Sequence, residues 1–313
     1  MKYVFFGSAE FSAVVLEQLI LAQLKPVLIV TTSPKPVGRK QIMTPTKVKQ
    51  CADKFNIPVL MPNILTDDAF IKNITGLKPD FALLTAYGKI IPEPILKIPK
   101  KGFVNLHPSL LPRWRGATPI QSAILNGDPE TGVSLFEMDE LLDHGPIIAQ
   151  AKYLISNSRI TFEELSQHLA KLGVRLILDN IYQWFDGKII SQPQDESLAT
   201  SCHKISPTEE HLNWQDKVEI IDRKIRAFNP NPGVFTIAQD KIIKIIKGFP
   251  IIDSQSVNLR PPGEVFEYLE KQLAVQGGNG YYVIEMLKPS GKNIMTSDSF
   301  LRGNKWIIGQ ILI

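Results

Sequence analysis

The chain has 313 residues, of which 44% are hydrophobic and 21% are charged, and its formal net charge at pH 7 is +4. This length is comfortable for two domains that each bury a core, and the mild positive charge permits an anionic partner without demanding one. The two cysteines, Cys51 and Cys202, belong to no CxxC pair, which argues against a disulfide framework or a zinc site and fits a reducing cytoplasm. The apolar stretch 241–247 is interrupted by lysines, so we expect no membrane span.

The first half of the chain alternates short apolar runs with helical patterns. We expect strands at 3–6, 27–31, 59–60, 81–86 and 104–106, and helices at about 11–24, 46–55 and 67–76. This rhythm predicts an α/β fold with a Rossmann-like, doubly wound and mostly parallel sheet. Ligands of such sheets bind beyond the carboxyl ends of the strands, so we expect one shared crevice there.

The turn after the first predicted strand reads Gly7-Ser8-Ala9-Glu10-Phe11. It does not match the G-x-G-x-x-G pattern, so a dinucleotide site is poorly supported. We favour a tight strand-to-helix turn over a phosphate cradle.

The segment 31–52 is basic and contains no acidic residue. Its prolines and Gly38 predict that its first part is a loop rather than a helix. Lysine and arginine side chains in such a loop suit the phosphates of a nucleic acid, although an ordinary solvated loop would show the same composition.

Two polar loops follow predicted strands in the middle of the chain. Strand periodicity places Asn105 and His107 on one face, and Pro108 then forces the chain out of the strand. A second predicted strand, 132–138, also ends in a polar loop, which carries Asp143. Residue positions alone leave open whether these residues are catalytic or are a buried histidine and a turn-forming asparagine.

The chemistry that these residue types suit is acyl transfer to an amine. An asparagine can donate a hydrogen bond to a developing oxyanion, a histidine can shuttle a proton near neutral pH, and a carboxylate can fix the tautomer of the histidine. No serine or cysteine beside them forms a recognisable nucleophile motif, so we favour direct transfer over a covalent intermediate.

The second half begins with a helix predicted at about 162–185, which Thr161 and Glu164 open as a capping box. A polar linker and a helix near 215–227 follow. Short β-rich runs are then expected at 234–238, 241–247, 263–268, 273–275 and 281–286. They predict a small β-barrel, and from Ser206 onward thirteen Lys/Arg face twelve Asp/Glu, so net charge does not announce RNA binding there. We therefore expect a first domain at 1–189, a linker at 190–207 and a second domain at 208–313.

The stretch Asn-x-His-Pro-Ser-Leu-Leu-Pro (105–112), followed by Arg-Trp-Arg-Gly-Ala (113–117) and Leu-Asp-x-Gly (142–145), resembles the signature of the formyltetrahydrofolate-dependent formyltransferases. Residues 113–120 and 127–133 resemble most closely the branch of that family that acts on methionyl-tRNA. Further matching motifs lie at 7–11, 36–40, 86–88 and 226–230. The resemblance therefore covers nearly the whole chain.

The resemblance implies transfer of a formyl group from 10-formyltetrahydrofolate to the α-amine of methionine on initiator tRNA, with no metal ion. It implies a catalytic trio of Asn105, His107 and Asp143. Asn105 would hydrogen-bond the formyl oxygen and His107 would assist the oxyanion and the proton traffic. Asp143 would orient His107 or collect the proton of the amine.

The same resemblance implies the binding residues. The folate would contact Ser109, Leu110, Leu111 and Pro112, and a pocket wall of Tyr87, Gly88, Ile90 and Ile91. From sequence alone the apolar members of that wall suit a core equally well. The tRNA acceptor end would contact Lys35, Arg39 and Lys40, and the second domain would be an OB-like barrel that binds tRNA.

Two positions depart from the usual pattern of the family: Leu141 replaces a frequent glycine, and His144 stands where a smaller or acidic residue is common. Two other functions stay open. A formyltransferase for a small amine such as glycinamide ribonucleotide would need neither the barrel nor the basic loop. A non-catalytic RNA-binding protein would not need the trio. We expect a cytoplasmic monomer.

Overall fold

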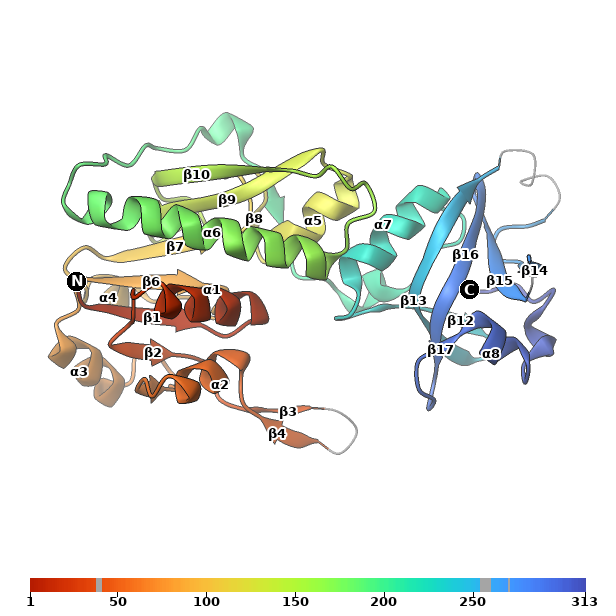
Figure 1. Ribbon diagram of the computed structural model, residues 1–313, viewed down its shortest axis with the longest axis horizontal. Coiled ribbons are helices and arrows are strands. Elements are labelled where there is room, and N and C mark those ends of the chain that lie inside the picture. Colours follow the sequence, from red (N-terminus) through yellow and green to blue (C-terminus); the bar gives the residue numbers. More distant parts are fainter. Residues whose placement is uncertain (38–40, 254–259, 270) are drawn as a thin grey trace. The chain divides into compact units, whose positions relative to one another are not determined.

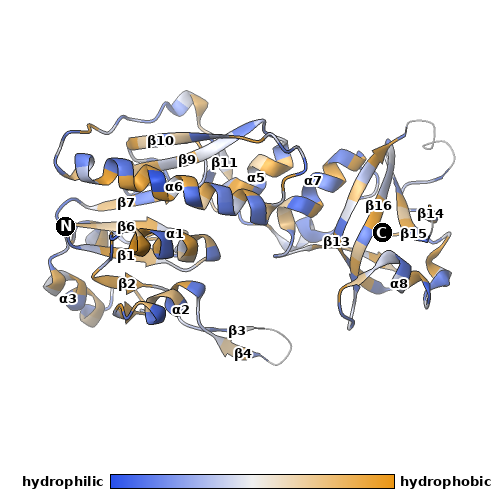
Figure 2. Ribbon diagram, viewed as in Figure 1, coloured by the Kyte–Doolittle hydropathy of each residue, from blue (hydrophilic) through white to orange (hydrophobic). Residues whose placement is uncertain are grey.

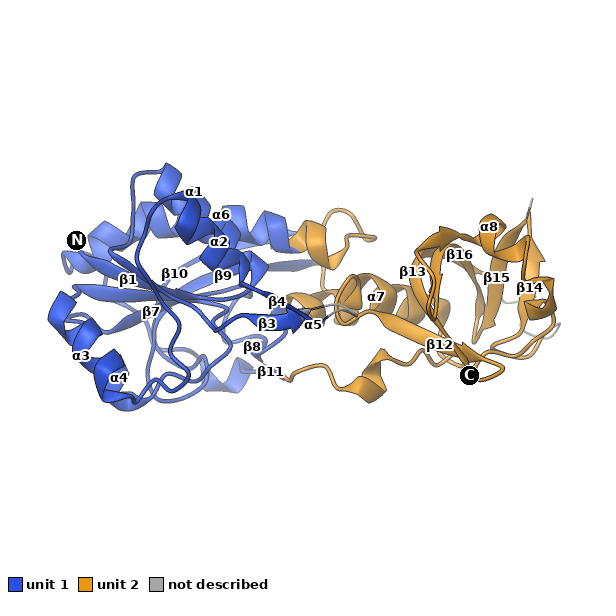
Figure 3. Cartoon of the chain, turned by 90° about the horizontal axis from the view of Figure 1, so that it is seen from below, with its two compact units in different colours: residues 1–119, 130–154, 166–202 blue, residues 120–129, 155–165, 203–313 orange. Residues whose placement is uncertain are grey.

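The computed structural model describes residues 1–37, 41–253, 260–269 and 271–313 (Figure 1). These residues form two compact units. The first comprises residues 1–119, 130–154 and 166–202, and the second comprises residues 120–129, 155–165 and 203–313 (Figure 3). Each unit is built on a sheet of its own.

The first unit contains a seven-stranded sheet in the order β10-β9-β7-β6-β1-β2-β5. Its strands are β1 (Tyr3–Gly7), β2 (Leu28–Val30), β5 (Val59–Leu60), β6 (Phe81–Thr85), β7 (Phe103–His107), β9 (Glu130–Glu137) and β10 (Ile147–Leu154). Neighbouring strands pair in parallel along the spatial order β5-β2-β1-β6-β7. Strands β9 and β10 add antiparallel pairs at one edge. The predicted α/β fold with a mostly parallel sheet is confirmed.

Helices cover both faces of this sheet (Figure 3). They are α1 (Glu10–Leu21), α2 (Lys47–Lys54), α3 (Asp68–Leu77), α4 (Glu93–Leu96) and α6 (Phe162–Phe185). On one face, Phe6 of β1 belongs to a core cluster with Phe70 of α3 and Ile95 of α4. On the other face, the ring of Phe81 in β6 lies 5.9 Å from that of Trp184 in α6. Cover on both faces explains why the central strands are hydrophobic at almost every position (Figure 2).

The structure corrects the predicted loop in the basic segment. A β-hairpin of β3 (Lys35–Val37) and β4 (Ile42–Thr44) stands there, with Lys35 opposite Thr44. Pro36 lies in β3 and pairs with Met43. Both strands of a two-stranded hairpin are edges, and an edge strand tolerates proline where its nitrogen faces away from the partner strand.

Several elements were not predicted, among them α4, α5 (Pro119–Asn126), β10 and the two-stranded ladder of β8 (Arg115–Gly116) with β11 (Ser201–Cys202). In β10 the exposure of the side chains alternates along much of the strand, which is the period of a half-buried strand. That signal was present in the sequence. The β8–β11 ladder is too short to leave a periodic signal.

The second unit is an antiparallel β-domain. Its strand order is β12-β13-β16-β15-β14, and β17 also pairs with β16. The strands are β12 (Val234–Ala238), β13 (Lys241–Ile252), β14 (Val265–Tyr268), β15 (Gln272–Gly277), β16 (Gly280–Pro289) and β17 (Met295–Thr296), accompanied by α7 (Val218–Phe228) and α8 (Ser297–Leu301). Helix α7 buries one face, which includes Ile221, Ile225 and Phe228.

The expected closed OB-like barrel is not confirmed, because β12 and β14 remain at opposite ends of the strand order among the described residues. The last residues of the chain lie between these strands. Ile313 exchanges two backbone hydrogen bonds with Ile237 of β12, at 2.7 and 3.0 Å. Leu312 N–H donates to the carbonyl oxygen of Gly263 at 2.8 Å, and Val265 N–H donates to that of Gln310 at 2.9 Å.

Within the described ranges, no helix is both long enough and apolar enough to cross a membrane.

Candidate active site

Asn105 and His107 lie in the last three residues of β7. This strand pairs in parallel with β6 and antiparallel with β9. Both residues are buried, at 7% and 4% exposure. Alternation along the strand gives their side chains the same face, as predicted. Buried polar side chains at this point need partners, and the turn after β9 supplies one.

That turn brings Asp143 to the pair. Its Oδ1 lies 3.4 Å from Nδ2 of Asn105, and its Oδ2 lies 3.6 Å from Nδ1 of His107. The N–H of Gly116 donates to Oδ2 at 2.8 Å. Asp143 has a φ of +50°, a left-handed conformation that aspartate adopts more readily than most residues. The structure thus gathers all three predicted trio residues, with one short bond to Asp143 and two longer separations that a bound substrate can shorten.

The protonation of His107 follows from its neighbours. Its Nε2 lies 2.9 Å from the carbonyl oxygen of Trp114. A carbonyl oxygen can only accept, so Nε2 carries a proton. Nδ1, which faces the carboxylate of Asp143, is therefore the ring atom that can take up and return a proton.

Asn105 has an unmatched acceptor. Its Oδ1 is buried and has no hydrogen-bond partner among the described residues. Leaving such an atom unsatisfied costs about 1–3 kcal/mol, so the site favours a guest that brings a donor. Nδ2 has two hydrogens, of which Asp143 can accept one. The second can be donated to a bound oxygen.

The loop after His107 is held from the antiparallel edge of the sheet. Ser134 Oγ in β9 donates to the carbonyl oxygen of Ser109 at 2.7 Å and accepts from Leu111 N–H at 2.9 Å. Gln150 Nε2 in β10 donates to the carbonyl oxygen of Leu111 at 2.8 Å. The buried hydroxyl of Ser109 donates to the carbonyl oxygen of Arg113 at 2.6 Å. Ser109 therefore shapes the loop through internal bonds.

The other two loop residues, Leu110 and Pro112, contact different segments of the unit. Leu110 lies so close to Gly132 that a Cβ added there would be 2.6 Å from its Cδ2. The carbonyl oxygen of Pro112 accepts from Thr200 N–H at 3.1 Å. The roles of Ser134 and Gln150 were not predicted from the sequence. The two-residue period of a strand could have shown which face of the sheet these side chains share.

The predicted pocket wall follows β6, the neighbour of β7. Tyr87 is 1% exposed, and Ile91 belongs with it to the hydrophobic core. The Tyr87 hydroxyl has no hydrogen-bond partner in the described part of the chain, and burial raises the pKa of Tyr87 to about 12. The hydroxyl therefore stays protonated and can donate. Gly88, with a φ of +81°, and Ile90, which is 87% exposed, face solvent instead.

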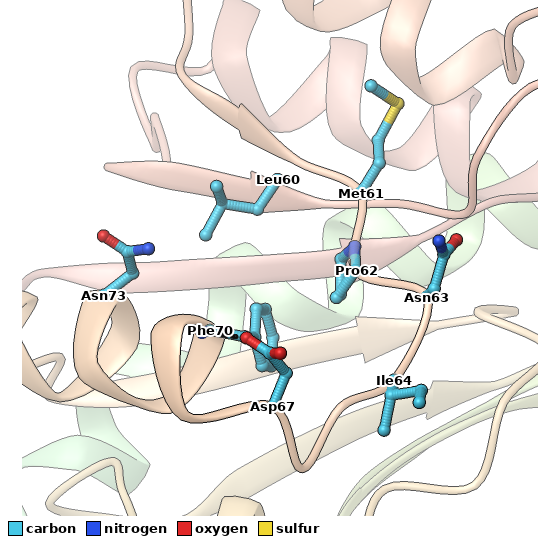
Figure 4. Close-up of a pocket in the computed structure, with 8 residues that line it drawn as sticks. All are labelled: Leu60, Met61, Pro62, Asn63, Ile64, Asp67, Phe70 and Asn73. Carbon is cyan, nitrogen blue, oxygen red and sulfur yellow. Dashed lines mark hydrogen bonds between the residues drawn. The ribbon is translucent and has the colours of Figure 1, made fainter.

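A cavity of about 360 Å³ lies where β5 ends and α3 begins (Figure 4). Its lining residues are Leu60, Met61, Pro62, Asn63, Ile64, Asp67, Phe70 and Asn73. The Lys89 ammonium ties its rim to the turn after β6, because it donates to the carbonyl oxygens of Pro62 and Asn63 at 2.8 and 2.9 Å. No residue of the trio lines this cavity.

Of the predicted tRNA contacts, Lys35 is an exposed residue of β3. Arg39 and Lys40 lie outside the described residues. Across the hairpin, Ile42 and Met43 are each 61% exposed. The hairpin therefore presents both charge and apolar surface.

The two unusual positions flank Asp143. Leu141 is 62% exposed. His144 Nδ1 lies 2.6 Å from Oδ2 of Asp139, and its Nε2 lies 3.5 Å from Oε1 of Glu196. Over the described ranges, no group of three or more His, Cys, Asp or Glu side chains is placed to hold a metal ion.

A family model described as Formyl transferase matches residues 1–181, and one described as Formyl transferase, C-terminal domain, matches residues 204–305. The chain belongs to the formyltransferase family. Relatives named methionyl-tRNA formyltransferase include those of Dictyoglomus thermophilum, 39% identical with 99% of both chains covered, and Bacillus cytotoxicus, 37% identical with 100% of this chain and 98% of the relative covered. A third, from Moorella thermoacetica, is 34% identical with 100% and 99% covered. The resemblance inferred from the motifs is confirmed.

Two solved structures share the fold. HypX from Aquifex aeolicus, solved with tetrahydrofolic acid, aligns with a TM-score of 0.67 and 16% identity over 96% of this chain and 47% of its own. An N-formyltransferase from Helicobacter canadensis, solved with folinic acid and dTDP-3-aminofucose, aligns with a TM-score of 0.66 and 21% identity over 91% of this chain and 98% of its own. At these identities the likeness concerns the fold alone.

Proposed function

We propose that this formyltransferase transfers the formyl group of 10-formyltetrahydrofolate to the α-amine of methionyl initiator tRNA, giving formylmethionyl-tRNA for translation initiation. The observation that carries the proposal is the similarity to methionyl-tRNA formyltransferases along the whole chain. The buried trio supplies groups that suit this chemistry.

The residues of the site fit the folate donor. Two buried polar atoms, Asn105 Oδ1 and Tyr87 Oη, have no partner among the described residues, and a polar ligand with donors and acceptors would satisfy both. We assign folate binding to Ser109, Leu110, Leu111 and Pro112 together with Tyr87, Gly88, Ile90 and Ile91. When bound, the donor supplies a formyl carbon that is already activated on a folate nitrogen.

We assign catalysis to the trio. Asn105 donates its free Nδ2 hydrogen to the formyl oxygen as negative charge develops there. As the formyl carbon passes to the amine, its bond to the folate nitrogen breaks. The amine must lose a proton and the folate nitrogen must gain one, and Nδ1 of His107 and Oδ2 of Asp143, 3.6 Å apart, are the atoms that take and return it. The Gly116 N–H keeps the carboxylate in place during this transfer.

We assign tRNA binding to Lys35 of the hairpin, to Arg39 and Lys40, which follow it in the sequence, and to the second domain. Residues 1–189 are the catalytic domain, 190–207 the linker, of which residues up to 202 belong to the first compact unit, and 208–313 the tRNA-binding domain. That last domain is an OB-like barrel whose two edge strands both bond to the C-terminal residues. The protein acts as a cytoplasmic monomer.

One assay tests the proposed function. The purified protein is incubated with 10-formyltetrahydrofolate and, separately, methionylated initiator tRNA, methionylated elongator tRNA or glycinamide ribonucleotide. We expect donor-dependent formylation of the initiator methionyl-tRNA above all. Formylation of the small amine alone would instead support the small-amine enzyme, and tRNA binding without any formylation would support the non-catalytic RNA-binding protein.

A further inference from the structure

The polar segment 194–202, part of the predicted linker, lies against the turn that carries Asp143. Gln194 Nε2 donates to the carbonyl oxygens of Asp143 and Gly145, at 2.9 and 2.8 Å. Gln194 Oε1 accepts from Nε and Nη2 of Arg115, at 3.0 and 2.7 Å. The two hydrogens and both lone pairs of this amide are therefore in use.

The backbone of the Asp143 turn is tightly packed at Gly145. A Cβ added to Gly145 would lie 1.8 Å from the carbonyl oxygen of Glu137, so no other residue fits there without movement of the turn. Since Asp143 itself has a φ of +50°, the direction of its carboxylate depends on this backbone. Gln194 holds the two carbonyls that define the turn.

The end of the segment fixes the other partner of the carboxylate. Strand β11 pairs in parallel with β8, Ser201 opposite Arg115 and Cys202 opposite Gly116. Gly116 has a φ of +119°, and a Cβ there would lie 2.1 Å from the carbonyl oxygen of Cys202. The N–H of this glycine is the one that donates to Asp143 Oδ2, so the ladder places the donor of the carboxylate.

The same segment reaches His107 through one intermediate residue. Thr200 Oγ1 accepts from Trp114 N–H at 2.9 Å. Trp114 has a φ of +60°, which is unusual for a bulky side chain and needs external support. Its carbonyl oxygen is the acceptor for His107 Nε2.

An ion pair joins the segment to β8. Arg115 Nη1 and Nη2 lie 2.9 and 2.6 Å from the two oxygens of Glu196. The hydrogen bond from Arg115 lowers the pKa of Glu196. At neutral pH the pair is therefore charged on both sides.

We infer that segment 194–202 is part of the catalytic apparatus and that Gln194 is a positioning residue for Asp143. The inference rests on the proposed function, because it presumes that Asp143 acts in formyl transfer. A reacting group displaced by about 1 Å can cost about 10²-fold in rate, so a side chain that holds the Asp143 turn acts on the chemistry without contact with substrate.

The substitution Gln194→Glu tests this role. It keeps an oxygen for Arg115 but turns a second oxygen, with no hydrogen to donate, toward the carbonyls of Asp143 and Gly145. The matched control is Gln192→Glu, the same change at an exposed site whose amide donates to the carbonyl oxygen of Ile190. We expect Gln194→Glu to lower the single-turnover rate about tenfold or more, with KM for donor and tRNA within about twofold. Gln192→Glu should resemble wild type.

A double-mutant cycle with Asp143→Asn separates positioning from general damage. If Gln194 acts through Asp143, the double variant should be no more than about twofold slower than Asp143→Asn alone. Multiplied losses would overturn the inference, and so would a wild-type rate for Gln194→Glu beside an impaired Asp143→Asn. A wild-type rate for Asp143→Asn would remove Asp143 from the chemistry and the inference with it, whereas absence of formylation by the wild-type protein would overturn the proposed function. The neutral Gln194→Met variant repeats the cycle without added charge, should Gln194→Glu fold poorly.

Discussion

Two polar segments of the first unit differ in how the fold holds them. The turn with Asp143 receives hydrogen bonds from Gly116 and Gln194 and leaves no room for a side chain at position 145. The β3–β4 hairpin pairs with itself and exposes Lys35, Ile42 and Met43. A reacting carboxylate needs fixed atoms, whereas a contact to a phosphate backbone needs accessible charge. Under the proposed function, the chemistry and the share of tRNA binding that the hairpin supplies lie in different parts of the first unit.

The largest effect that separates the two segments is expected from the removal of the Asn105 side chain. Asn105→Ala deletes the proposed donor to the formyl oxygen, and loss of such a donor typically lowers kcat about 10²- to 10³-fold. Affinity for tRNA should not change. Steady-state rates at saturating substrates, with tRNA binding measured in parallel, check this. Asn73→Ala, in the separate cavity, is the control (Figure 4); an equal loss in that variant would move the site to the cavity.

A smaller effect is expected at the hairpin. Lys35→Ala should lower the salt slope of tRNA affinity by about one unit and leave donor binding unchanged, because one phosphate contact is lost. For Arg39→Ala, a pure charge contact gives the same slope change. If Arg39 also positions the tRNA, Arg39→Ala should lower the formylation rate more than the tRNA affinity. The reason is that a guanidinium can bind a phosphate through two hydrogen bonds or stack on a base, where a lysine cannot.

Binding and single-turnover formylation across a salt series distinguish the two roles. Lys72→Ala, an exposed cation on α3, is the matched control. Unchanged slopes in Lys35→Ala and Arg39→Ala would erase the contrast, because the hairpin would then be an ordinary solvated element.

The smallest effect concerns Tyr87. Its hydroxyl is buried without a partner among the described residues, so Tyr87→Phe should not destabilise the protein and can raise the free energy of unfolding by about 1 kcal/mol. Donor affinity should fall a few-fold, about the value of one neutral hydrogen bond. Tyr3→Phe is the control, because the Tyr3 hydroxyl donates to the carbonyl oxygen of Leu24 at 2.8 Å and its loss should destabilise the fold. Unchanged donor affinity in Tyr87→Phe would remove this hydroxyl from the folate site.

Local patterns made much of the fold predictable. The apolar runs at β1, β6 and β7 and the helices between them indicated the parallel sheet, because each element carries its own period. The same period placed Asn105 and His107 on one face of a strand. The positions of Asn105, His107 and Asp143 at or after strand ends indicated one shared crevice, and the resemblance to a family named the three as a trio.

Other features depend on contacts between distant segments and left no local signal. Gln194 looked like an ordinary residue of a polar linker, and its two carbonyl partners lie about fifty positions earlier. Pro36 argued for a loop, yet a hairpin edge accommodates it. The C-terminal residues 310–313 bond to β12 and β14, an arrangement that only the pairing of the strands reveals.

The Asp143→Asn variant tests the catalytic role of the trio most directly, with single-turnover formylation measured at saturating donor and initiator methionyl-tRNA. Melting curves and the affinities for both substrates accompany it. We expect a loss of about 10²- to 10⁴-fold in rate, with both affinities within about twofold of wild type and an unchanged fold. A rate within about threefold of wild type would contradict the assignment of catalysis to Asn105, His107 and Asp143.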